Sequence, residues 1–165
     1  MSVFDEVLLA NHEYARNFRF GDLASAPARR LAVVCCMDAR ISVEPILGLQ
    51  PGDAHIVRNA GGIVTEDVIR SLLVSHYQLG TQEVLIINHT ECGMMKVTDE
   101  ELIRKLEAAT GVSSASPSAF LGFHDLDENV RRQVQRVRSH PWIPRCFKAR
   151  GAAYDVKTGR LREVM

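Results

Sequence analysis

The segment His89-Thr90-Glu91-Cys92 places an imidazole and a thiol three residues apart. In a first helical turn or a tight loop, this spacing brings both side chains to one side of the chain. An imidazole and a thiolate suit a soft divalent metal ion, above all Zn²⁺, which accepts both in tetrahedral geometry. The spacing alone also fits an ordinary loop histidine beside a buried cysteine, so a further ligand has to decide between the two interpretations.

A third ligand is available at the end of an earlier apolar run. Cys35 and Cys36 are adjacent in a predicted strand, so their side chains point to opposite faces and only one can face a given site. Cys36 is nearer the carboxyl end of that strand, which favours it as the ligand and leaves Cys35 as a small core residue. Cys146 has no neighbouring metal-binding partner, and we expect it to pack structurally.

Asp38 and Arg40 follow Cys36 at two-residue intervals. The simplest interpretation is a surface ion pair that contributes about 0–1 kcal/mol. A sharper one places a carboxylate beside the metal and holds it there with a guanidinium, whose planar fork binds a carboxylate at two points. Two thiolates and a neutral imidazole leave one tetrahedral position on the metal. A fourth protein ligand would close the site, whereas a water molecule would make it catalytic, because Zn²⁺ lowers the pKa of water towards about 7.

The elements around these residues alternate in type. Three apolar runs predict strands at residues 31–36, 54–58 and 83–88. Capping patterns begin four predicted helices, at Ser2, Thr65, Thr98 and Asp125. The tail contains a Thr158-Gly159 turn and predicts a further strand or hairpin. This alternation predicts an α/β fold with a largely parallel central sheet flanked by helices. Ligands of such sheets bind beyond the carboxyl ends of the strands, where the candidate ligands follow.

Length and composition limit the classes of protein. The 165 residues, with a mass of 18.4 kDa, suit a single domain spanning residues 1–165. The net charge is zero, so the chain does not have the excess of basic residues that is typical of nucleic-acid-binding proteins. No apolar run is long enough for a membrane span. Four cysteines are too few for a disulfide scaffold, so we expect a reducing, cytoplasmic location. The serine-rich stretch 112–118 predicts a surface loop.

Together these motifs resemble those of the β-class carbonic anhydrases. The family pattern C-x-D-x-R is matched by residues 36–40, and the pattern H-x-x-C, which follows a later strand, is matched by residues 89–92, after which Gly93 follows. The segments Pro51-Gly52-Asp53-Ala54 and Arg58-Asn59-Ala60-Gly61-Gly62 are also similar to family segments. The resemblance runs from roughly Leu31 to Met95, and the short chain resembles the compact microbial branch.

The resemblance implies a zinc enzyme. One Zn²⁺ per chain would be bound by Cys36, His89 and Cys92, and Asp38 with Arg40 would form the catalytic dyad. Arg40 would hold Asp38 off the metal while zinc-bound hydroxide attacks CO₂ to give bicarbonate, and in some members Asp38 rotates onto the metal and closes the site. The resemblance also implies an antiparallel edge strand on the parallel sheet. It further implies homodimers or dimer-based higher oligomers, in which an N-terminal helical arm of about residues 1–20 packs on the partner subunit.

Two other functions stay open on the sequence. One is a hydrolase of a CO₂ analogue, carbonyl sulfide or carbon disulfide, because hydroxide attack on a linear O=C=S is the same chemistry at the same zinc site. The other is a non-catalytic zinc-binding interaction domain in which Asp38 is a permanent fourth ligand. Arg40 argues against the second, because a structural site has no need to release its carboxylate. Both enzymatic interpretations call for a small-molecule substrate rather than a nucleic acid or a membrane.

Overall fold

The computed structural model describes residues 1–113, 116–117 and 119–165. In chain order its elements are α1 (Val3–Arg16), β1 (Leu31–Cys36), α2 (Val43–Leu47), β2 (Ala54–Asn59), η1 (Ala60–Gly62), α3 (Glu66–Tyr77), β3 (Glu83–His89), η2 (Gly93–Met95), α4 (Asp99–Thr110), α5 (Leu126–Arg138), β4 (Lys148–Tyr154) and β5 (Leu161–Glu163). The predicted strands and capped helices are confirmed, and the tail forms a hairpin. The short helices α2, η1 and η2 were not predicted. Residues 114, 115 and 118 of the predicted loop lie outside the described residues.

The five strands form one sheet in the order β2-β1-β3-β4-β5. The first four strands are parallel, and β5 runs antiparallel to β4 at the edge. Leu31 pairs with both Ala54 and Glu83, and Glu83 pairs with Lys148, so the four parallel strands begin level with one another. The sheet therefore has one amino end and one carboxyl end, as the predicted α/β class with an antiparallel edge strand requires.

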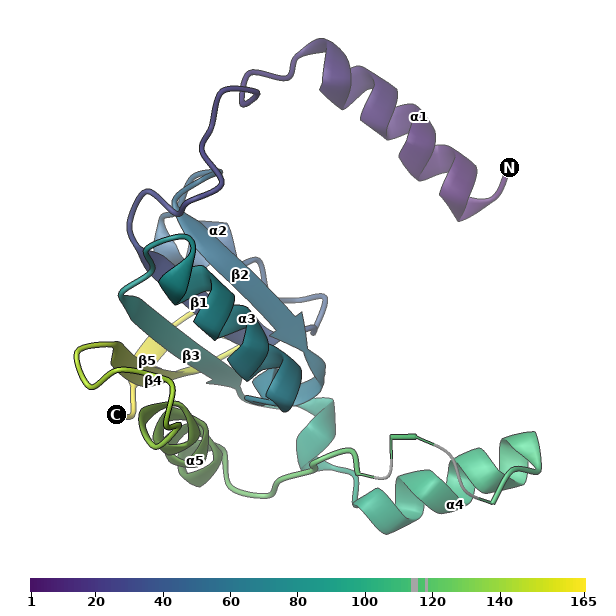
Figure 1. The fold of residues 1–165 in the computed structure, drawn as a ribbon. Helices are drawn as coiled ribbons and strands as arrows, with labels where there is room; N and C mark the ends of the chain where they lie inside the picture. Colours follow the sequence, from purple (N-terminus) through teal and green to yellow (C-terminus); the bar gives the residue numbers. More distant parts are fainter. Residues whose placement is uncertain (114–115, 118) are drawn as a thin grey trace.

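Helices α3 and α5 cover one face of the sheet (Figure 1). Their buried side chains, among them Val68 and Leu72 of α3 and Val134 of α5, pack on the face formed by alternate strand residues. A β-carbon at Gly151 in β4 would overlap the side chain of Val130 in α5, so glycine lets this helix lie close to the strand. This layer contains the larger of the two clusters of buried side chains.

The opposite face is covered more lightly. Val33 and Ile87 of the sheet pack there with Ile41 and with Val43 of α2. This second core continues to the carboxyl end of the sheet, where Cys92 belongs to it. The ends of β1 and β3 are therefore embedded in packed side chains, which limits their motion.

Two helices stand apart from the sheet (Figure 1). Neither α1 nor α4 has a buried residue, although each begins with a capping box. Helix α1 exposes several large apolar side chains, including Phe4, Val7 and Leu8. In the part of the chain that the structure describes, no helix has the length and apolar character needed to cross a membrane.

Candidate metal centre

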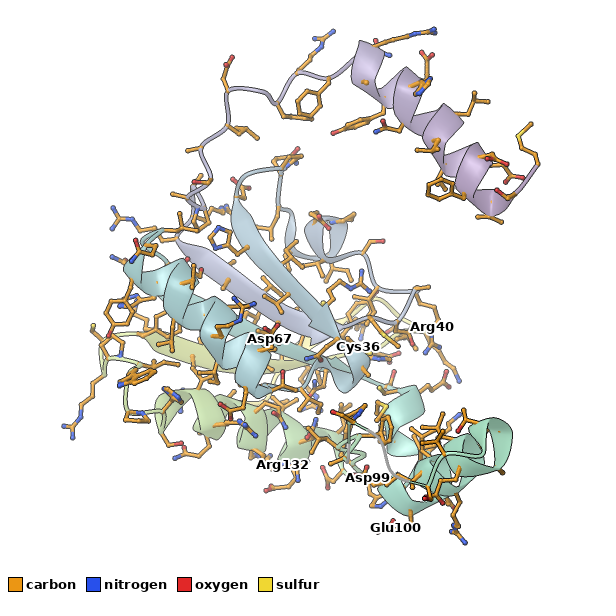
Figure 2. All side chains as sticks on the ribbon, turned by 45° about the vertical axis from the view of Figure 1, so that its right-hand side comes forward. Cys36, Arg40, Asp67, Asp99, Glu100 and Arg132 are labelled. Atoms are coloured by element: carbon orange, nitrogen blue, oxygen red, sulfur yellow. The ribbon has the colours of Figure 1, made fainter. Side chains whose placement is uncertain are left out.

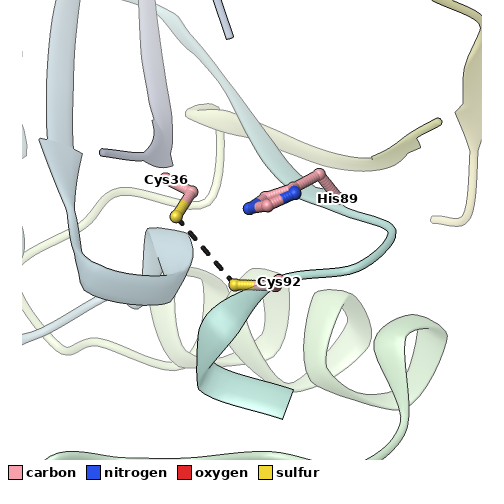
Figure 3. A group of neighbouring side chains, drawn as sticks. All are labelled: Cys36, His89 and Cys92. Carbon is pink, nitrogen blue, oxygen red and sulfur yellow. Dashed lines mark hydrogen bonds between the residues drawn. The ribbon is translucent and has the colours of Figure 1, made fainter. Parts of the chain in front are cut away.

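Three donor side chains meet where β1 and β3 end (Figure 3). Cys36 is the last residue of β1 and His89 is the last residue of β3, while Cys92 follows in the loop before η2. Since β1 and β3 are neighbouring parallel strands, their carboxyl ends lie side by side. The sheet topology alone therefore brings together residues that are more than fifty positions apart in the chain.

The donor atoms of Cys36, His89 and Cys92 all lie within 4.8 Å of one another. The two sulfur atoms are 4.0 Å apart. All three residues are buried, with His89 fully shielded from solvent. Such a cluster is the arrangement that a metal ion requires, because each side chain offers one donor atom towards a common point.

The orientation of the His89 ring is set by the loop that follows it. His89 Nδ1 lies 2.9 Å from the carbonyl oxygen of Thr90, and because a carbonyl only accepts, Nδ1 carries the proton. Nε2 then carries a lone pair. That buried atom has no hydrogen-bond partner among the residues that the structure describes. A backbone carbonyl on one ring nitrogen and a free lone pair on the other is the usual arrangement of a metal-binding histidine.

The contact between the two thiols shifts their pKa values in opposite directions. The hydrogen bond from Cys92 is the largest cause that holds the pKa of Cys36 well below its usual range, and it outweighs the opposing effect of burial. The hydrogen bond to Cys36 raises the pKa of Cys92, and burial raises it further. The site therefore favours a thiolate at Cys36, the form of cysteine that binds metals.

This donor set fits Zn²⁺. Two sulfur donors and one imidazole nitrogen are soft to borderline ligands, which select zinc over the oxygen-preferring ions Mg²⁺ and Ca²⁺. Two features of the cluster suit metal binding: the lone pair on His89 Nε2 and the lowered pKa of Cys36, which favours the thiolate. Three protein donors leave room for one more ligand in a tetrahedral site.

Asp38 lies beside this cluster and is held by Arg40. Arg40 Nε donates to Asp38 Oδ1 at 2.9 Å and Nη2 donates to Oδ2 at 2.7 Å, and the backbone N–H of Arg40 adds a third hydrogen bond to Oδ1. These contacts hold the pKa of Asp38 well below its usual range. Asp38 Oδ2 is 3.8 Å from His89 Nε2. Figure 2 shows Arg40 further towards the surface than Cys36.

Arg58 fixes the backbone that carries Cys36 and Asp38. Its Nε donates to the carbonyl oxygen of Cys36 at 3.0 Å, and its Nη2 donates to the carbonyl oxygen of Asp38 at 2.8 Å. This role of Arg58 was not predicted from the sequence. The signal available was a lone arginine at the end of the neighbouring strand β2, which does not say which carbonyl groups it reaches.

A buried amide network supports the turn beneath Cys36. Asn88 Nδ2 donates to the carbonyl oxygens of Gly61 and Gly62, and Asn129 Nδ2 donates to Asn88 Oδ1 at 2.9 Å. Gln133 Nε2 donates to Asn129 Oδ1, also at 2.9 Å. A β-carbon at Gly62 would lie 2.9 Å from Asn88 Nδ2 and 3.0 Å from the backbone nitrogen of Cys36, so only glycine fits. This network was also missed, because lone amides carry no recognisable spacing.

The remaining cysteines differ from each other. Cys35 is fully buried, as expected of a core residue, and burial raises its pKa to about 11. The expectation that Cys146 packs structurally is wrong, because this cysteine is exposed. Its neighbours Ile143 and Phe147 supply the buried side chains of that segment, which leaves Cys146 pointing outwards.

Comparison with known proteins gives consistent matches. The sequence profile of the carbonic anhydrase family matches residues 31–161. The chain is 41% identical over 165 residues to β-carbonic anhydrase 1 of Mycobacterium tuberculosis, with 99% of each chain covered. It is 40% identical over 157 residues to the carbon disulfide hydrolase of an Acidianus species, covering 82% of this chain and 77% of that protein. The crystal structure of carbonic anhydrase from Streptococcus mutans superposes with a TM-score of 0.94 at 45% identity, covering 100% of this chain and 99% of that one.

Proposed function

The chain belongs to the β-carbonic anhydrase family, and on that premise we propose that it is a zinc enzyme interconverting CO₂ and bicarbonate. The observation that carries the proposal is the cluster of Cys36, His89 and Cys92 with a guanidinium-held carboxylate, Asp38, beside it. The cluster alone would fit a structural zinc site. The adjacent ion pair of Asp38 with Arg40 is what a reactive site needs and a structural site does not.

The metal and the protein have separate tasks. Zn²⁺ held by Cys36, His89 and Cys92 would supply Lewis-acid activation of a water molecule for attack on CO₂. The Thr90 carbonyl keeps His89 in the tautomer that offers Nε2. The thiolate of Cys36 would supply negative charge for binding the cation.

Asp38 would act through its free lone pairs. Because Arg40 holds the pKa of this carboxyl low, Asp38 stays ionised at neutral pH and acts as a hydrogen-bond acceptor. An acceptor placed 3.8 Å from His89 Nε2 is within reach of a water molecule beside the ligands. Asp38 would orient that water, while Arg40, through its two-point contact, would keep the carboxylate from moving onto the metal.

A direct assay tests this function. Protein with one zinc per chain should hydrate CO₂ in a stopped-flow measurement. Cys36→Ala should lose both zinc and activity, whereas Asp38→Ala should retain zinc and lose activity. Folded, zinc-loaded protein without CO₂ hydration at any pH would contradict the proposal. Asp38→Ala with full activity would contradict the role of the dyad.

A second candidate substrate is carbon disulfide or carbonyl sulfide. The 40% identity to a protein named carbon disulfide hydrolase favours it. The wider coverage of the carbonic anhydrase match, 99% against 77% of the relative's length, favours CO₂. Hydrogen sulfide release from each sulfur compound, compared with CO₂ hydration by the same preparation, ranks the substrates. The non-catalytic zinc domain gains support only if all three assays fail.

We also propose that the N-terminal arm, about residues 1–20, packs on a partner subunit in a homodimer or a dimer-based oligomer, with the rest of residues 1–165 as a single domain. Helix α1 supports this, because it has no buried residue yet exposes apolar side chains that include Phe4 and Leu8. Light scattering should give the mass of at least a dimer, and the double variant Phe4→Glu with Leu8→Glu should shift the protein towards a monomer.

A cytoplasmic location is proposed because metal-binding thiols need a reducing compartment.

A further inference from the structure

Glu91 lies between the candidate ligands His89 and Cys92 in an uncommon backbone conformation. Its φ of 56° is in the left-handed region, which is unfavourable for a residue with a β-carbon. The backbone carbonyl of Glu91 accepts a hydrogen bond from Arg40 Nη2 at 3.3 Å, and Glu91 Oε2 is 3.5 Å from Arg40 Nη1. Glu91 therefore contacts the outer side of the same guanidinium that holds Asp38.

Lys157 anchors the Glu91 carboxylate from the other side. Lys157 Nζ is 2.6 Å from Glu91 Oε1, so the two carboxylate oxygens are divided between Lys157 and Arg40. Lys157 lies in the turn between β4 and β5. That turn is attached to the ligand loop, because the backbone N–H of Val156 donates to Thr90 Oγ1 at 3.1 Å. A continuous series of charges thus runs from Lys157 through Glu91 and Arg40 to Asp38.

We propose that Glu91 is a positioning residue that, anchored by Lys157, keeps the Arg40 guanidinium on Asp38 and so keeps the Asp38 carboxylate away from the metal ligands. The inference rests on the proposed CO₂ hydration, in which Asp38 and Arg40 act together. The Arg40 side chain is 47% exposed, so without Glu91 solvent can draw it away. Asp38 Oδ2 is 3.8 Å from His89 Nε2, and a small rotation would then bring it into the cluster.

The chain contains a matched ion pair for comparison. Glu83 and Lys148 are the first residues of β3 and β4, the two strands whose carboxyl ends lead to Glu91 and Lys157. Lys148 Nζ lies 2.8 Å from Glu83 Oε1. The side chains of this pair are 46% and 71% exposed, and those of Glu91 and Lys157 are 43% and 73% exposed. The two pairs therefore match in chemistry and exposure and differ in what lies beside them.

The first measurement is CO₂ hydration by zinc-loaded variants at one fixed pH. Glu91→Gln should lower kcat/KM about fivefold and Lys157→Met about twofold, the range expected from losing an exposed ion pair. The double variant should be no slower than Glu91→Gln, because Lys157 acts through Glu91. Zinc content should not change. The controls Glu83→Gln and Lys148→Met should keep the wild-type rate.

The second measurement is independent of turnover. In cobalt-substituted protein, the visible absorption reports the ligands of the metal. Glu91→Gln should change the spectrum in the same direction as Arg40→Gln, because Asp38 is released in both, while Glu83→Gln should keep the wild-type spectrum.

Three results separate the inference from the function on which it rests. A Glu91→Gln variant with wild-type kcat/KM and spectrum overturns the positioning role. Fully additive effects in the double variant overturn the relay through Lys157. A wild type without CO₂ hydration overturns the proposed function instead, and the cobalt spectra then still decide whether Glu91 controls Asp38.

Discussion

The two ends of the β3–β4 strand pair carry the same kind of contact in different surroundings. Glu83 meets Lys148 at the amino end, 2.8 Å apart, and Glu91 meets Lys157 just beyond the carboxyl end, 2.6 Å apart. The first pair joins two strands and contacts nothing of the metal centre. The second also contacts Arg40. Two contacts of the same chemistry therefore have different surroundings, and the strand end at which each lies decides what it can influence.

The same contrast extends across the sheet. At the carboxyl end, backbone turns and buried amides press directly against the residues of the metal centre. At the amino end, the polar side chains of His55, Ser75 and Thr81 are hydrogen-bonded to one another, away from the metal centre. In parallel sheets all strands deliver their following loops to one edge, so functional groups accumulate there. Paired substitutions at the two ends test this division.

The largest difference is expected between two glycines. Gly62 and Gly80 both have left-handed backbone angles, φ 61° and 75°. A β-carbon at Gly62 would press on the backbone of Cys36, whereas at Gly80 it would meet nothing within 4 Å. We expect Gly62→Ala to cost about 3 kcal/mol or more and to abolish zinc binding. Gly80→Ala should cost about 1–2 kcal/mol and leave zinc binding intact. Denaturant unfolding measures the stability of each variant, and zinc titration measures its metal binding. Equal losses of stability and zinc binding in the two variants would contradict the expected difference between the two ends of the sheet.

A smaller difference is expected between two buried polar groups. Asn129 supports Asn88 at the carboxyl end, while Ser75 Oγ lies 2.6 Å from Thr81 Oγ1 at the amino end. Asn129→Ala should cost about 2 kcal/mol, because it leaves buried amides unpaired, and it should also lower kcat/KM. Ser75→Ala should cost about 1 kcal/mol with kcat/KM unchanged. A loss of activity in the Ser75 variant would contradict the division between the ends.

Two arginines that bind backbone carbonyls provide the next comparison. Arg58 donates to the carbonyls of Cys36 and Asp38, and Arg138 donates to the carbonyl of Ala149 near the start of β4, at 2.6 Å. Arg58→Ala should lower kcat/KM about tenfold, because the segment carrying two functional side chains loosens. Arg138→Ala should affect stability alone. Steady-state kinetics with parallel melting curves check both, and similar kinetics for the two variants would argue against the prediction.

The smallest expected effect is a pH dependence at a pair outside the metal centre. Arg162 Nη2 donates a hydrogen bond to Asp127 Oδ1 at 2.7 Å. This contact lowers the pKa of Asp127 in the folded protein. A lowered pKa stabilises the fold above the ordinary pKa of about 4, and the contribution is lost as the pH falls through the lowered value. Asp127→Asn should therefore cost less than about 1 kcal/mol at neutral pH and nothing in strong acid. Activity should not change. If the difference in unfolding free energy between the wild type and Asp127→Asn grew as the pH fell, the pKa of Asp127 would not be lowered by folding, and the prediction would be wrong.

The sequence predicted the three central strands and the four capped helices because each of them is specified locally, whereas the short helices α2, η1 and η2 carry no such local pattern. The capping box of Ser2 with Asp5 and the cap at Thr65 define helix starts through contacts between near neighbours. Apolar runs define the strands in the same way. Alternation of the two types then implies a parallel sheet, and with it a common carboxyl end.

Of the candidate site, the predicted residues were those that belong to short motifs. Cys36, His89 and Cys92 do meet, as the spacing and the resemblance implied. Arg58 and Asn129 escaped prediction because their partners are backbone carbonyls and amides that only the fold brings near. Residues of this kind have no characteristic spacing in the sequence.

Helix α1 has a consequence for how the protein responds to dilution. A helix of 14 residues with no buried side chain is marginally stable in water by itself, so its order depends on what covers it. If a second copy covers it, the arm folds and docks in one linked equilibrium whose position depends on protein concentration. Helical content measured by circular dichroism should then fall on dilution, while the sheet and its α3 and α5 layer stay folded. The arm would report the assembly state of the protein through its own helicity.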